Sequence, residues 1–342
     1  RKGRSFMQIL VIGGTRFMGP HVVRRLLDQG HQVTLFHRGN APLDLPGIQV
    51  IKGDRRRLSE SATALSALQP DVILDMVPMI ESDAVDLINL FRGQAGRLVA
   101  IGSADVYRNF GGLIGRVEAE PDPTPMNEDS PLRARLYPYR GETPLPADHP
   151  MAWRDAYDKI PVEQAVLGAP ELSGTILRLP MVWGPGDGQR RLRPYIKRMD
   201  DGRPAILLGE QQAQWRTCRG YVENVAAAIA AAVLNPRAAG RVYNVADDAQ
   251  ILSERQWVEA IAGTLGYQGE IRILPDEKLG GGKMEYHIAL DATRIRTELG
   301  WREEVSLAEG IARTAEWERA NPPAQEAPDA FDYAKEDSLL AE

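Results

Sequence analysis

A glycine-rich turn near the start of the chain has the residue types that bind a diphosphate. It follows the apolar segment 8–12 and leads into helical apolar spacing over 21–27. Glycines let the backbone come close to a pyrophosphate, and the amides at the start of a helix meet its charge. We therefore predict a dinucleotide site here rather than a turn without a ligand. The expected cofactor contacts are Gly13, Thr15, Arg16, Phe17, Met18 and Gly19.

Two arginines indicate which dinucleotide to expect. Arg16 stands where related motifs carry another glycine, and its guanidinium can pair with a phosphate. Arg38 follows the second predicted strand, where an NAD enzyme would place an acid on the ribose hydroxyls. NADP carries one more phosphate than NAD, so the sequence favours NADP(H), with NAD(H) as the alternative. In the competing interpretation, Arg38 is a solvated loop charge.

Asp54 comes directly after the third predicted strand. It is predicted to accept a hydrogen bond from the adenine amine. A turn-capping aspartate without a ligand is the alternative.

Strands and helices alternate along most of the chain, which predicts an α/β fold with a doubly wound parallel sheet of Rossmann type. The predicted strands are 8–12, 32–36, 49–51, 72–74, 98–101, 175–179 and 242–245. The predicted helices are 21–27, 59–68, 83–91, 160–167, 223–234, 255–265 and 307–319.

The composition shift along the chain suggests a domain division. Residues 7–180 are predicted to form the dinucleotide-binding domain, with the chain crossing back later, and 181–320 mainly a smaller α/β substrate domain. The Pro- and acid-rich segment 321–342 is expected to be flexible. Residues 1–6 read as an expression remnant before a native start at Met7.

Composition excludes several classes of protein. The formal net charge of −6 provides no global positive field, so nucleic acid is not the default partner. The one cysteine, Cys218, excludes an internal disulfide framework and a Cys-cluster metal site, which suits the cytoplasm. No apolar run approaches the ~18 residues of a membrane span, and no His/Cys/acid cluster has metal spacing.

A series of motifs over residues 7–318 resembles the extended or atypical short-chain dehydrogenases/reductases, the NAD-dependent epimerase/dehydratase family. The glycine motif with Arg16 is most similar to a subgroup that includes the chloroplast stem-loop-binding proteins. The matching segments, in order, are IGSADVY at 101–107, NEDSPL at 127–132, RLPMVWGPGD at 178–187, GYVENVA at 220–226, YNV at 243–245, LD at 290–291 and LGW at 299–301.

The resemblance implies a Rossmann domain, a smaller C-terminal domain and a sugar-like, often nucleotide-linked substrate. It implies transient hydride transfer, with a tyrosine acid/base whose pKa a nearby lysine lowers. Met76, Pro180 and Val182 are included among the expected cofactor contacts. Family members often pair through a four-helix interface that includes the helix after Lys159, so a homodimer is the corresponding expectation.

The catalytic set departs from the family pattern Y-x-x-x-K. Lys159 and Glu163 keep their spacing, but Asp155 stands where the tyrosine belongs. Tyr157 is two residues from that place, which on a helix turns a side chain by ~200°. Tyr157 can still reach the site if residues 153–159 are irregular. Pro161 gives a reason to expect this, because proline discourages a regular helical turn there.

The other roles follow from the resemblance. Ser103 takes the position of the serine that hydrogen-bonds the reacting oxygen, and Lys159 also bonds the nicotinamide ribose. Tyr137 and Tyr139 are alternative phenols on a long loop, and Asp155 is an alternative base. Ser103 as a turn cap and Lys159 as a solvated helix lysine are the alternatives without function.

An arginine-rich stretch at 189–193, with Arg216 and Arg219, suits a diphosphate or another anionic group. An exposed cationic face or an RNA contact is the competing account. The leading hypothesis is an NADP(H)-binding epimerase, dehydratase or reductase. Its rival is a non-catalytic dinucleotide-binding protein with a regulatory or RNA-associated role, which the missing tyrosine at position 155 supports.

Overall fold

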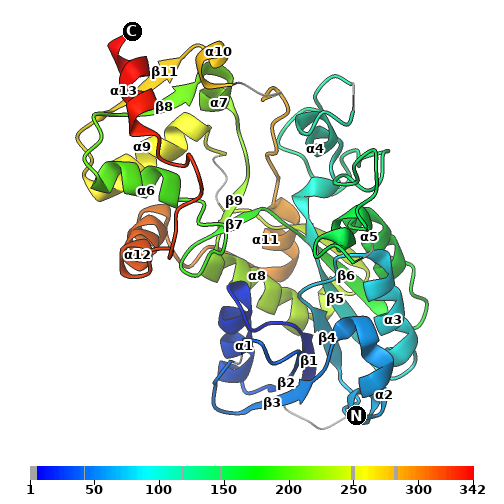
Figure 1. The fold of residues 1–342 in the computed structure, drawn as a ribbon. Coiled ribbons are helices and arrows are strands. Elements are labelled where there is room, and N and C mark those ends of the chain that lie inside the picture. The colour runs from blue at the N-terminus through cyan, green and yellow to red at the C-terminus, as the bar shows by residue number, and fades with distance from the viewer. Residues whose placement is uncertain (1–5, 42, 118, 147, 248–250, 281–283) are drawn as a thin grey trace.

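A seven-stranded, all-parallel sheet is the centre of the computed structural model (Figure 1), which describes residues 6–41, 43–117, 119–146, 148–247, 251–280 and 284–342. Its order is β10-β6-β5-β4-β1-β2-β3. The strands are β1 Gln8–Ile12, β2 Gln32–His37, β3 Ile48–Lys52, β4 Val72–Asp75, β5 Arg97–Ser103, β6 Ser173–Leu179 and β10 Arg241–Asn244. The predicted doubly wound sheet is therefore confirmed.

Helices cover both faces of this sheet, which explains why its inner strands are continuously apolar rather than alternating. Helices α1 (Met18–Asp28) and α8 (Val222–Leu234) pack together on one face. Helices α2 (Ala62–Ala67), α3 (Glu81–Phe91) and α5 (Lys159–Leu167) cover the other. In Figure 1 these two groups flank the strands.

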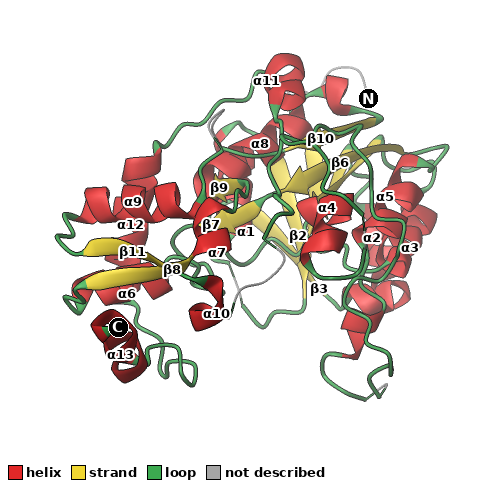
Figure 2. Cartoon of the chain, turned by 90° about the horizontal axis from the view of Figure 1, so that it is seen from above, coloured by secondary structure: helices red, strands yellow, loops and turns green. Residues whose placement is uncertain are grey.

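The chain leaves the large sheet after β6 and returns to it at β10, which pairs with β6 in parallel. The two predicted domains are therefore not separated by one boundary at residue 180, since β10 belongs to the large sheet. This agrees with the expectation that the chain crosses back later. Between these strands, β7 (Met181–Trp183) pairs with β9 (Arg219–Tyr221). Strand β8 (Ala205–Gly209) pairs with β11 (Glu270–Leu274), to one side of the large sheet in Figure 2.

The remaining elements are short or lie in the C-terminal half. The helices are α4 Arg108–Leu113, α6 Arg193–Asp200, α7 Glu210–Gln214, α9 Glu254–Leu265, α10 Asp276–Leu279, α11 Thr293–Leu299, α12 Leu307–Ala320 and α13 Tyr333–Ala341. The 3-10 turns are η1 Arg55–Ser61, η2 Ala104–Val106, η3 Ala152–Asp155 and η4 Pro236–Ala238. In the described part of the chain, no helix is long and apolar enough to cross a membrane.

The C-terminal segment, for which composition predicts flexibility, carries helix α13, and some of its acidic residues pair with arginines of the substrate half. Glu326 binds Arg193, and Glu336 lies 2.6 Å from Arg198. The flexibility of 321–342 stays a prediction. Of the predicted N-terminal remnant, residues 1–5 lie outside the described residues.

Candidate active site

The glycine turn connects β1 to α1 and brings its backbone to the start of that helix. Gly13 and Gly14 have φ of 85° and 79°, a region that side chains disfavour. A Cβ on Gly19 would lie 2.3 Å from the carbonyl carbon of Gly14, so only glycine allows this close approach. Within the described residues, the amides of Phe17 and Met18 at the start of α1 donate no hydrogen bond. This geometry fits a bound pyrophosphate.

Both arginines of the NADP argument are exposed. Arg16 lies in the turn and Arg38 follows β2, so they flank the carboxyl ends of β1 and β2. Among the described residues, neither forms an ion pair. Their charges are thus available to a ligand at this edge of the sheet.

The other expected cofactor contacts lie at the ends of strands. Met76 directly follows β4 and is buried, Pro180 separates β6 from β7, and Val182 lies within β7. Asp54 follows β3, where its Oδ1 accepts a hydrogen bond from the amide of Arg56 at 3.0 Å. Asp54 therefore caps η1, as in the alternative interpretation of a turn-capping aspartate. One of its carboxylate oxygens is used in this hydrogen bond.

Ser103 is the last residue of β5 and lies opposite Leu179, the last residue of β6. The Ser103 hydroxyl accepts a hydrogen bond from the amide of Asp105 at 3.2 Å. It therefore caps η2 and at the same time stands at the edge of the sheet where the glycine turn lies.

The start of α5 decides where Tyr157 points. Asp158 is the N-cap, its carboxylate accepting from the amide of Ile160 at 2.9 Å, and Lys159 is the first helical residue. Tyr157 therefore precedes the helix, and the ~200° rotation expected for a two-residue shift within a helix does not apply. Pro161 lies in the first turn, where proline is tolerated, so the helix begins beside it rather than breaking.

As a result, Tyr157 reaches the end of β5. Its hydroxyl donates a 2.7 Å hydrogen bond to Asp105, two residues beyond Ser103. The ammonium of Lys159 lies 5.8 Å from the centre of the Tyr157 ring. The structure thus brings together Ser103, Tyr157 and Lys159, although the sequence lacks the regular motif.

Lys159 is buried and held by backbone oxygens. Its Nζ donates to the carbonyls of Pro78 at 2.7 Å and Ile101 at 3.0 Å. Burial lowers the pKa of Lys159 to about 8, although the carboxylates of Asp105 and Asp75 oppose that shift. This is not the solvated helix lysine of the alternative reading.

The proton-bearing groups of the site perturb one another. Burial raises the pKa of Asp105, while its hydrogen bond from Tyr157 and the charge of Arg133 oppose the change. Burial and the nearby Asp105 carboxylate raise the pKa of Tyr157 well above that of a free phenol. Strong perturbation of neighbouring groups in this way is common at functional sites.

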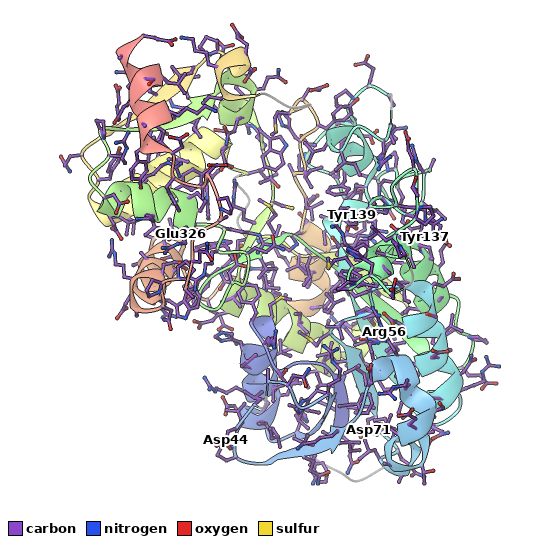
Figure 3. The ribbon with its side chains drawn as sticks, viewed as in Figure 1. Asp44, Arg56, Asp71, Tyr137, Tyr139 and Glu326 are labelled. Carbon is purple, nitrogen blue, oxygen red and sulfur yellow. The ribbon has the colours of Figure 1, made fainter. Side chains whose placement is uncertain are left out.

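The alternative phenols lie on the loop before η3, where Figure 3 labels both. The ring of Tyr139 lies 5.3 Å from that of Tyr157, so it borders the site. The amide of Tyr137 donates to Asp158 at 2.7 Å, and its ring stacks under Arg140. Asp155, the alternative base, accepts instead from the backbone amide of Leu145.

Several motif residues belong to a buried network that the sequence did not predict. Arg178 on β6 binds Glu163 on α5 at 2.8 Å and Tyr107 at 3.0 Å. Tyr107 in turn donates to Asn244 on β10 at 2.6 Å, and the Asn244 amide binds Glu128 at 2.9 Å. These residues join β6, α5 and β10 in the core, so their motifs have a structural role.

A second ion cluster was also missed. Arg55 follows Asp54 and reaches Asp75, at the end of β4, at 2.6 Å, and Asp83 on α3 at 3.2 Å. Arg55 lies in a run of three arginines that reads as a solvated turn. Its partners become apparent only in the folded sheet, because the carboxyl ends of the parallel strands β3 and β4 point to the same side of the sheet.

The arginine-rich stretch is largely occupied by internal partners, contrary to the prediction of an open anion site. Arg190 binds Glu318 at 2.6 Å, Arg191 binds Asp187 at 2.8 Å, and Arg193 binds Glu326. Arg219 is paired with Glu254 and stacks on Trp257. Arg190, Arg193 and Arg219 pair with carboxylates from distant segments and so stabilise the substrate half, whereas the partner of Arg191 lies four residues away.

A cavity of about 500 Å³ lies in the substrate half beside β7 and β9. Trp183, Trp257 and Leu307 give it apolar walls, and Arg219 and Asp247 add charge. Oδ2 of Asp247 accepts from the amide of Tyr221 at 2.7 Å, whereas Oδ1 is buried without a hydrogen-bond partner among the described residues. The Asp247 side chain therefore borders the cavity, but its unpartnered oxygen is buried.

Comparison with known proteins gives independent evidence on the fold and the family. The family model for the NAD dependent epimerase/dehydratase family matches residues 9–246. The chain is 25% identical over 330 residues to the chloroplast stem-loop binding protein of 41 kDa b of Arabidopsis thaliana, covering 90% of this chain and 78% of that protein. It is 26% identical over 349 residues to a dTDP-glucose 4,6-dehydratase of Streptomyces niveus, covering 92% and 94%.

Solved structures show the same fold. A UDP-glucose 4-epimerase of Thermotoga maritima with UDP-glucose matches with a TM-score of 0.66 and 18% identity, covering 92% of this chain and 99% of that one. The Bordetella bronchiseptica enzyme WbmH in complex with NAD+ matches with a TM-score of 0.66 and 17% identity, covering 92% and 98%.

Proposed function

Because the chain belongs to the NAD-dependent epimerase/dehydratase family, we propose that it is an NADP(H)-binding enzyme of the epimerase, dehydratase or reductase type. Its substrate is a sugar-like, nucleotide-linked molecule, and its reaction proceeds by transient hydride transfer. The observation that carries the proposal is the position of Tyr157 beside Ser103 and Lys159 at the end of β5. A non-catalytic protein would not need a tyrosine hydroxyl beside Ser103 and Lys159.

The glycine turn, Phe17 and Met18 would hold the pyrophosphate through their amides. Lys159 would bond the nicotinamide ribose, and Met76, Pro180 and Val182 would border the ring. Ser103 would hydrogen-bond the reacting oxygen and Tyr157 would move its proton. The bound nicotinamide would supply hydride acceptance and return.

The preference for NADP(H) rests on Arg16 and Arg38, which are exposed at the edge where the cofactor would lie. A guanidinium binds a phosphate in bidentate fashion, whereas a ribose hydroxyl needs an acid that the end of β2 lacks. NAD(H) is the alternative, and five of the matched structures were solved in complex with NAD or NAD+.

The nucleotide-linked substrate is supported by two relatives named for such sugars, the dTDP-glucose dehydratase and the UDP-glucose epimerase. In this chain the cavity beside β7 and β9 offers aromatic walls together with the polar side chains of Arg219 and Asp247. Those features suit a ligand that presents a ring and polar groups.

The test is a fluorescence titration of the purified protein with NADPH and with NADH, without substrate. We expect both to bind and NADPH to bind more tightly. If neither NADPH nor NADH binds, the cofactor proposal is wrong. If NADH binds more tightly, Arg16 and Arg38 do not select NADP(H). Hydride exchange with UDP-glucose and dTDP-glucose would then be assayed in the wild type and in Tyr157→Phe, which should lose activity.

A homodimer is also proposed, through the outer face of α3 and α5, which pack together. Val85 on α3 and Leu167 on α5 are large apolar side chains that are 37% and 40% exposed there. Light scattering during gel filtration would measure the mass, and a single-chain mass at high concentration would contradict the proposal.

The second candidate function is an RNA-associated role, favoured by the similarity to the chloroplast stem-loop binding protein. Binding of a labelled stem-loop RNA at two salt concentrations would test it. The paired state of Arg190, Arg191 and Arg193 argues against an open cationic surface at that stretch.

A further inference from the structure

The buried carboxylate of Asp105 lies 2.7 Å from the hydroxyl oxygen of Tyr157. We propose that Asp105 accepts the proton of Tyr157 during the reaction, so that a substrate hydroxyl loses its proton through a two-residue relay. This inference rests on the proposed function and adds to it a residue of the 101–107 motif to which the sequence analysis gave no role. Asp105 acts on the substrate only through Tyr157, and it is therefore a positioning residue.

The contact itself is well defined. Asp105 belongs to η2, immediately after β5, and is only 6% exposed. Its Oδ2 accepts the Tyr157 hydroxyl at 2.7 Å, and its Oδ1 is buried without a hydrogen-bond partner among the described residues. A buried carboxylate with one orphan oxygen is costly, and protonation relieves that cost.

Other charged groups surround this carboxylate without binding it directly. Arg133 donates from Nε to the backbone oxygen of Asp105, and its terminal nitrogens pair with Asp158. Lys159 donates to the carbonyls of Pro78 and Ile101. Both cations favour the ionised form of Asp105 through space, whereas burial and Asp158 favour the protonated form.

The displaced position of Tyr157 explains why such a partner is needed. Burial and Asp105 raise the pKa of Tyr157, so a free phenolate does not form near neutral pH. Lys159 directs its hydrogen bonds to backbone carbonyls and not to the phenol. The phenol can accept a proton only if it releases its own, and Asp105 is the acceptor within reach.

In the oxidation of an alcohol, the substrate O–H bond breaks and its proton passes to the Tyr157 oxygen, while the phenol's original proton passes to Oδ2 of Asp105. The two electrons of the C–H bond leave as hydride to the oxidised nicotinamide dinucleotide, and a carbonyl forms. In the reducing direction Asp105 returns the proton through Tyr157.

The experiment follows the Tyr157 ring by NMR in protein labelled with carbon-13 at the tyrosine Cζ, without cofactor or substrate. The Tyr157 signal is assigned by its loss in Tyr157→Phe. Over the window from about pH 4 to pH 7, which lies below the pKa of about 8 of Lys159, we expect its chemical shift to titrate in the wild type, because Asp105 gains or loses the proton that it shares. The titration should vanish in Asp105→Asn and persist in Asp155→Asn, the matched control.

A flat signal in the wild type, or an unchanged titration in Asp105→Asn, would overturn the relay. In the hydride-exchange assay we expect Asp105→Asn to lose about 100-fold or more in turnover, with NADPH affinity unchanged. If the titration is lost in Asp105→Asn but neither NADPH nor NADH binds, the carboxylate–phenol pair stands and the proposed function fails. Full turnover in Asp105→Asn would also overturn the relay.

Discussion

The carboxylate of Asp158 is paired with the guanidinium of Arg133 at 2.8 Å, and both side chains are almost fully buried. The same carboxylate caps α5 and accepts from the amide of Tyr137 at 2.7 Å. Asp158 thereby joins the loop before η3 to the start of the helix that carries Lys159, and holds Tyr157 between them.

Replacing Asp158 with alanine should destabilise the protein by about 3–5 kcal/mol, because it leaves the buried Arg133 charge without its partner. The free energy of unfolding, from urea titration followed by circular dichroism, measures this. Asp158→Asn retains a capping oxygen and should cost less than the alanine. Equal stability of Asp158→Ala and the wild type would contradict the assigned role.

Gly19→Ala should weaken the binding of NADPH at least ~10-fold, because the added Cβ collides with the backbone of Gly14 and shifts the start of α1. Fluorescence titration gives the affinity. Gly263→Ala in α9, where a Cβ meets nothing within 4 Å, is the control and should bind NADPH as the wild type does. Unchanged affinity in Gly19→Ala would mean that the cofactor does not use this turn.

The double variant Arg16→Gln, Arg38→Gln should lose NADPH affinity by about 10–100-fold, since hydrogen bonds to charged groups are worth about 1.5–3 kcal/mol. Its affinity for NADH should not change, because NADH lacks the extra phosphate. Arg237→Gln, an exposed arginine of η4, serves as the control. An equal loss of affinity for NADPH and NADH would mean that the two arginines attract either dinucleotide through their charge and do not recognise the extra phosphate.

Stability should depend on the ionisation of Asp247, because burial raises its pKa to about 7. Unfolded chains ionise this carboxyl near pH 4, so between about pH 4 and 7 the folded state holds the extra proton and stability falls as pH rises. From pH 5 to pH 8 the wild type should lose on the order of 2 kcal/mol more than Asp247→Asn. Urea unfolding at both pH values checks this, and identical pH slopes would contradict it.

The sequence by itself determined the sheet and the cofactor turn. Apolar runs buried on both faces and glycines between strand and helix are local signals, so 8–12 and Gly13 to Gly19 could be identified without knowing their neighbours. Ser103 and Lys159 were found through their motifs. Short elements such as β7 and β9 were missed because three residues give no measurable period.

Only the tertiary structure decided where the side chain of Tyr157 lies. Whether Tyr157 reaches Ser103 depends on where α5 begins, and that depends on the bonds of Asp158 to Arg133 and Tyr137, which are 25 and 21 residues away. The partners of Arg190 and Arg193 likewise come from residues more than 120 positions later. Charges pair through space, so a linear pattern cannot distinguish an arginine that awaits a ligand from one that already has a carboxylate.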